Sequence, residues 1–62
     1  MDDFYVELQD ANGTAYVCDK SYDDLDGAKL AAKSSLRDKY VVGRVINVNT
    51  KKVVDFFERW MK

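Results

Sequence analysis

Apolar and polar residues alternate over two short segments near the start of the chain, Phe4–Gln9 and Thr14–Cys18. Such alternation is typical of strands with one buried face, marked in the first segment by Phe4, Val6 and Leu8. The dipeptide Asn12-Gly13 between the segments supplies the positive φ angles of a tight hairpin turn. A loop of two or four residues places Leu8 on one face with Ala15 and Val17, and places on the other face Tyr5, Glu7, Tyr16 and Cys18.

The segment that follows has the spacing of an amphipathic helix. Ser21 is a helix-capping residue type, and Asp24 three residues later completes a weaker form of the capping box. Acids in the first turns and bases in the last turn match the helix dipole: Asp23, Asp24 and Asp26, then Arg37 and Lys39. A mostly small stripe predicts that the helix lies close on a sheet: Leu25, Ala28, Ala32, Ser35 and Leu36.

The last two segments are rich in β-branched residues. Tyr40–Val48 predicts a strand, and Asn49–Lys52 predicts a turn. Val53–Met61 is ambiguous, because its apolar residues gather on one arc of a helix. The valine pair and the lysines that precede it nevertheless favour a strand over Val53–Phe57.

These elements predict one small α+β domain for residues 1–62, with a four-stranded antiparallel sheet and one helix on one face. The expected arrangement is β-β-α-β-β, and a right-handed crossover from the second strand gives the strand order 2-1-3-4. The alternative is β-β-α-β-α with a C-terminal helix. If the first strand lies beside the third, Glu7 and Asp10 come near Arg44.

Charge is divided unevenly along the chain. Residues 1–27 hold eight acidic residues and one lysine, whereas residues 28–62 hold nine basic and three acidic residues, for a net charge of −1. Such asymmetry points to charged partners. The pattern predicts an acidic patch at one end of the helix and a basic flank that runs from it.

Few residues are available for catalysis or metal binding. The chain has no histidine and one cysteine, which excludes histidine-dependent nucleophile triads, an internal disulfide and a Cys/His zinc site. We therefore predict a protein that is not an enzyme and has no cofactor and no metal site. The charges of Asp19 and Lys20, which follow Cys18, roughly cancel. We therefore expect a small apolar strand residue rather than a reactive thiol, which needs an electropositive setting.

The start of the chain lacks the basic residues and the apolar run of a secretory signal, and no stretch is long enough to cross a membrane. These features predict a cytoplasmic protein without a membrane partner.

Two surfaces are candidates for binding. Tyrosines on a sheet face that one helix leaves open suit a protein interface, although ordinary cross-strand pairing explains them equally well. The candidate partner-binding residues are Tyr5, Glu7, Tyr16, Asp19, Asp23, Asp24 and Asp26. An alternative nucleic-acid-binding surface consists of Lys29, Lys33, Arg37, Lys51 and Lys52. A third interpretation is a self-associating structural protein that forms a homodimer through the open sheet face.

The helix start Ser-Tyr-Asp-Asp-Leu-Asp-Gly-Ala-Lys-Leu-Ala (residues 21–31) stands between a hairpin and a valine-rich strand. This pattern, over about Phe4 to Val48, resembles small proteins of bacteriophages and prophages and is similar to phage inhibitors of bacterial RNA polymerase. The second hairpin, Val45 to Phe57, departs from it. The resemblance implies a non-catalytic protein that binds and blocks a host or defence macromolecule in the host cytoplasm, and it assigns no role to individual residues.

Overall fold

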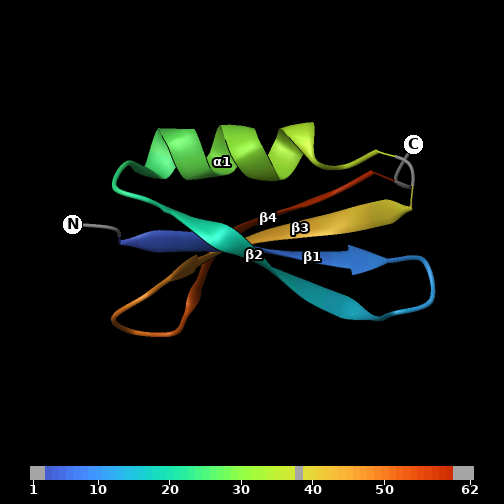
Figure 1. The fold of residues 1–62 in the computed structure, drawn as a ribbon, viewed down its shortest axis with the longest axis horizontal. Helices are drawn as coiled ribbons and strands as arrows, with labels where there is room; N and C mark the ends of the chain where they lie inside the picture. Colours follow the sequence, from blue (N-terminus) through green and yellow to red (C-terminus); the bar gives the residue numbers. More distant parts are fainter. Residues whose placement is uncertain (1–2, 38, 60–62) are drawn as a thin grey trace.

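The computed structural model describes residues 3–37 and 39–59, which form one helix packed on one antiparallel sheet. The elements are β1 (Phe4–Asp10), β2 (Ala15–Tyr22), α1 (Leu25–Ser34), β3 (Tyr40–Asn47) and β4 (Val53–Glu58). The strand order is β2-β1-β3-β4, and α1 covers one face while the other face stays open (Figure 1). The predicted α+β fold and its strand order are confirmed.

The segment Val53–Glu58 is a strand, so the alternative with a C-terminal helix is wrong for these residues. It pairs with β3 from Val42, opposite Glu58, to Ile46, opposite Val53. The β-branched residues at its start suit a pleated backbone and lose side-chain freedom in a helix. Trp60 and Met61, which the alternative helix included, lie outside the described residues.

The core fills the space between α1 and the sheet. Its central buried residues are Val6, Leu8, Ala28, Ala32 and Val45. Ala28 and Ala32 are both 0% exposed, so the small stripe predicted on the helix does face the sheet. Leu25, the first residue of that stripe, remains 37% exposed.

The helix is shorter than predicted at both ends. Ser21 is not its cap, because β2 continues through Tyr22 and Ser21 pairs with Tyr5 on β1. The N-cap residue is Asp24, whose side chain makes no capping hydrogen bond. The C-cap residue is Ser35, so Arg37 and Lys39 lie beyond the last turn, and Lys33 is the base within it. Strand pairing thus overrides the capping preference of Ser21.

Asp10 and Thr14 form the pair that closes the β1–β2 hairpin, so its loop consists of three residues, 11–13, rather than two or four. The N–H of Gly13 donates to the carbonyl oxygen of Asp10 at 3.0 Å. The N–H of Asp10 donates to the carbonyl oxygen of Thr14, also at 3.0 Å. Gly13 has φ 93°, in the region that favours glycine. This is a type I turn followed by a left-handed residue, the usual form of a three-residue hairpin loop.

The odd loop length reverses the predicted faces of β2. It shifts the pairing by one residue, so Leu8 stands opposite Tyr16 instead of Val17. Directly opposed residues share a face, and neighbours along a strand alternate. Tyr16 and Cys18 therefore lie on the helix side of the sheet, whereas Val17 lies on the open face. The prediction for these residues is wrong because it considered only loops of even length.

Candidate protein-binding surfaces

Within residues 3–37 and 39–59 the structure contains no pocket. The same residues hold no group of three or more His, Cys, Asp or Glu side chains suited to a metal ion. None of the described helices is long and apolar enough to cross a membrane. Three surface regions carry the candidate residues: the open sheet face, the acidic end of α1 and the basic flank of α1.

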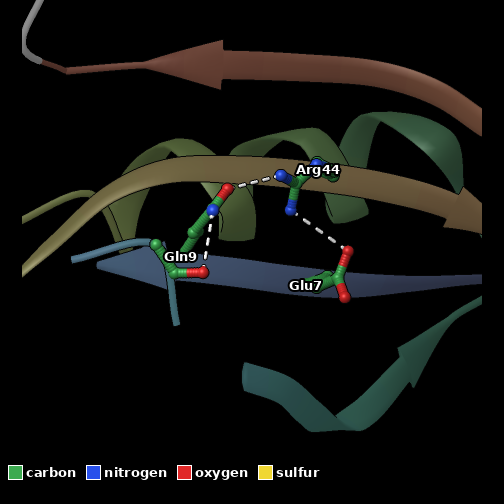
Figure 2. A network of polar contacts seen from close by, with 4 residues as sticks. Glu7, Gln9 and Arg44 are labelled. Carbon is green, nitrogen blue, oxygen red and sulfur yellow. Dashed lines mark hydrogen bonds and ion pairs between the residues drawn. The ribbon is translucent and has the colours of Figure 1, made fainter. Parts of the chain in front are cut away.

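A polar network occupies the middle of the open sheet face. The Arg44 Nη1 atom lies 3.1 Å from Glu7 Oε1, in an ion pair between directly opposed residues of β3 and β1. Arg44 Nη2 also donates to Gln9 Oε1, and Gln9 Nε2 donates to the carbonyl oxygen of Gly13 at 3.0 Å. Figure 2 shows this network in front of the sheet with α1 behind it. The expected approach of Glu7 to Arg44 is confirmed, and the charge of Glu7 is paired within the sheet.

Apolar side chains lie at the two edges of the open face. Val17 on β2 is 61% exposed, and Phe56 and Val53 on β4 are 55% and 52% exposed. Tyr5 is also on this face, half-buried, with the Lys51 ammonium 6.0 Å from its ring centroid. Sequence reasoning did not single out Val17, Val53 or Phe56. Phe56 lies on the open face because it stands opposite Arg44. The sequence would show this only once the register of the β3–β4 hairpin is known.

Tyr16 lies on the opposite side of the sheet from Tyr5, so the two tyrosines do not form one surface. The Tyr16 ring packs edge-on against Tyr40, with ring centroids 5.5 Å apart and planes 76° apart. Its hydroxyl donates to Asp10 Oδ2 at 3.3 Å, and the Lys39 ammonium is 4.9 Å from its ring centroid. Tyr16 thus takes part in the packing at the hairpin end of the molecule.

Asp10 organises the hairpin and does not pair with Arg44. Its Oδ1 accepts the backbone N–H groups of Asn12 and Thr14, each at 3.0 Å. The residue is 9% exposed. The β1–β3 register shifts between Gln9 and Asp10, which separates this carboxylate from the ladder that holds Glu7 beside Arg44. The expectation that Asp10 comes near Arg44 is therefore wrong.

Four exposed carboxylates lie on β2 and around the start of α1, and we call them the acidic end: Asp19, Asp23, Asp24 and Asp26. Asp26 is in the first turn of α1, where the helix dipole favours a negative charge. Within the part of the chain that the structure describes, no hydrogen bond or ion pair engages the carboxylates of Asp19, Asp24 and Asp26. These charges remain available to a partner.

The basic flank consists of Lys29 and Lys33 on α1 and Arg37 just beyond its end, and all three make contacts within the protein. Lys29 Nζ lies 3.7 Å from Asp55 Oδ2 on β4, and Lys33 Nζ lies 5.5 Å from the Phe57 ring centroid. Arg37 Nε donates to the carbonyl oxygen of Ser34 at 2.9 Å. Lys51 and Lys52 are in the β3–β4 turn, which lies on the side of the sheet away from α1 in Figure 1. The five bases of the predicted nucleic-acid surface are not brought together.

Cys18 packs against the core cluster from β2. Burial raises the pKa of its thiol, and the neighbouring Asp19 carboxylate raises this pKa further. A raised pKa lowers the fraction of nucleophilic thiolate at neutral pH. The thiol is placed as a packing group.

Comparisons of the chain with protein-family models, with curated proteins and with solved structures find no match.

Proposed function

We propose that this protein is a small protein-binding module that attaches through its acidic end to a basic surface of a macromolecular partner. A phage-type modulator or inhibitor, which binds and blocks a host or defence complex, is the form of activity that suits it. The observation that carries the proposal is a difference in engagement: Lys29 and Lys33 make contacts within the protein, whereas Asp19, Asp24 and Asp26 have no partner among the described residues.

Carboxylates without a partner inside the protein attract a positively charged surface on another molecule. Electrostatic complementarity raises association rates and selects partners more than it adds affinity. Contact energy must therefore come from apolar groups near the acids. Two leucines of α1 fit this role, since Leu25 and Leu30 are 37% and 66% exposed and belong to the same helix as Asp26. An acidic surface of this kind competes with nucleic acid for a basic groove on the partner.

The experiment compares three immobilised baits in the same bacterial lysate. One bait is the unchanged protein, the second carries Asp19→Asn and Asp24→Asn, and the third carries Lys29→Gln and Lys33→Gln. Asparagine is chosen at position 24 because it remains a good helix N-cap, so the acidic variant keeps its fold. Each double variant changes the net charge by two, and circular dichroism checks that both are folded.

The proposal predicts a protein that the unchanged bait and the lysine variant retain and the acidic variant loses. Titration of that purified protein should show about a tenfold weaker affinity for the acidic variant, which corresponds to roughly 1.4 kcal/mol. Equal retention by all three baits contradicts the proposal. Loss from the lysine variant, or loss after nuclease treatment, supports the nucleic-acid alternative instead.

A further inference from the structure

β4 is an edge strand with an unusual number of exposed apolar side chains. It pairs with β3 on one side only in the described sheet, and Val53, Val54 and Phe56 are 52%, 45% and 55% exposed. The other edge, β2, carries the charged residues Asp19 and Lys20 in its middle. Exposed apolar edge strands are templates for pairing with another strand, and charge on an edge discourages it. Of the two edges, β4 is the one suited to strand addition.

The free backbone groups of β4 are identified by its pairing with β3. The N–H of Arg59 donates to the carbonyl oxygen of Val41 at 2.8 Å, toward β3. Backbone N–H groups alternate in direction along a strand. The N–H of Phe57 therefore also points to β3, and those of Phe56 and Glu58 point away from the sheet.

The outward N–H of Phe56 is occupied by the preceding side chain. It donates to Asp55 Oδ1 at 2.9 Å, while Asp55 Oδ2 lies 3.7 Å from Lys29 Nζ on α1. Asp55 thus holds a central donor of the edge and is itself held toward the helix. A charged residue placed in this way is one of the means by which proteins protect a sheet edge.

We propose that the β4 edge is a pairing surface for a second copy of this chain, and that the Asp55 carboxylate keeps it closed. In the two-fold antiparallel register that sets Phe56 opposite Phe56 of the second copy, each Phe56 donates its N–H to the other and Val54 lies opposite Glu58. That register joins the two sheets into one of eight strands and closes the assembly as a dimer.

Charge disfavours one of the two neighbouring registers. Moving the second strand by one residue along each copy would set Asp55 opposite Asp55, and like charges directly opposed are destabilising. In the proposed register Asp55 stands opposite Phe57 instead, and the exposed Phe56 rings of the two copies lie side by side on the open face. The donor that this register needs is the one that Asp55 occupies.

Analytical ultracentrifugation of single and double variants tests the proposal. Asp55→Ala removes the acceptor and should produce a dimer at concentrations where the unchanged protein is monomeric, with dimerisation strengthened by about tenfold or more. Asp55→Asn keeps an acceptor oxygen but loses the charge, so it should remain a monomer. Asp55→Val also removes the acceptor, and valine has a high strand propensity. It therefore repeats the first test, with the same expected dimer, if the alanine variant does not fold.

A further substitution shows whether the edge itself is used. Adding Phe56→Pro to Asp55→Ala removes the N–H at a solvent-facing edge position, where proline is tolerated, and should restore the monomer. In the dimer, the Phe56 amide should also become protected from hydrogen exchange. The proposal is overturned if both acceptor-free variants stay monomeric, if the asparagine variant dimerises equally, if the proline variant still dimerises, or if the unchanged protein already pairs through this edge.

Discussion

Gly43 on β3 lies directly under Ala32 on α1. A Cβ at position 43 would stand 3.2 Å from the Ala32 carbonyl oxygen and 3.5 Å from the Ala32 Cβ. The first distance is shorter than ordinary van der Waals contact, and the group it meets is backbone. The helix rests on the sheet at this point because neither residue has a larger side chain.

Gly43→Ala should therefore destabilise the protein although alanine suits a strand better than glycine. Overpacking of a core typically costs about 1–3 kcal/mol, against roughly 0.5–1 kcal/mol regained from glycine's backbone entropy. Urea unfolding followed by circular dichroism measures the difference. Unchanged or increased stability would show that α1 moves away from β3 without cost.

Gly27→Ala is the matched control, and it should stabilise the protein. A Cβ at this helical position would be 3.8 Å from Tyr22 Cδ2, which is ordinary contact distance. Alanine is favoured over glycine within a helix by about 1 kcal/mol. The two substitutions are chemically identical and should shift the urea midpoint in opposite directions.

Asp10→Ala should cost about 2 kcal/mol, because it leaves three donors of the hairpin without their acceptor. These donors are the N–H groups of Asn12 and Thr14 and the hydroxyl of Tyr16. Asp10→Asn keeps one acceptor oxygen and should cost less. Asp19→Ala on the exposed surface should change the free energy of unfolding by less than about 0.5 kcal/mol. Equal effects at positions 10 and 19 would contradict this role of Asp10.

Lys51→Gly should stabilise the β3–β4 turn. Lys51 has φ 62°, a conformation that costs a residue with a Cβ about 1 kcal/mol or more and costs glycine nothing. Its N–H donates to the carbonyl oxygen of Asn47 at 2.8 Å, so the turn depends on this conformation. Lys52→Gly removes the same charge and should not stabilise the protein. Thermal unfolding of the two variants should separate them, and similar midpoints would argue against relief of backbone strain.

Alkaline pH should weaken the protein through Cys18. Burial, and then Asp19, raise the pKa of this thiol in the folded state. In the unfolded chain the thiol loses its proton near its ordinary pKa of about 8.5, whereas in the folded protein it keeps the proton to higher pH. The free energy of unfolding is therefore unaffected by this thiol well below about pH 8.5 and decreases as the pH rises above that value. Cys18→Ser should flatten the fall in the urea midpoint between neutral pH and about pH 9.5. An identical pH profile for both proteins would show that other groups cause the loss.

The strand order could be predicted because it depends on patterns that survive small errors of boundary. Three patterns indicate the type of an element or its buried side rather than its exact ends. They are the alternation at Phe4–Leu8, the small stripe at Ala28 and Ala32, and the β-branched run after Tyr40. The helix start could not be placed, because Ser21 suits a cap and a strand equally and only its pairing with Tyr5 decides between them. Local preference is decided here by a partner far away in the sequence.

The candidate surfaces were harder to predict for a related reason. Their residues come together only through cross-strand register. Tyr16 was expected beside Tyr5, and an odd loop places it on the other side of the sheet. The basic spacing of Lys29, Lys33 and Arg37 was found correctly, but their engagement with Asp55, Phe57 and Ser34 depends on tertiary contacts that the sequence does not show.

The three-residue hairpin loop has a consequence for how this chain can vary. Inserting or deleting one residue between Ala11 and Gly13 would turn β2 over and exchange the inward Tyr16 and Cys18 for the outward Val17. A two-residue change would alter only the length of the tip. Descendants of this sequence should therefore tolerate insertions there in steps of two residues. Peptides inserted into the tip for display should likewise add an even number of residues.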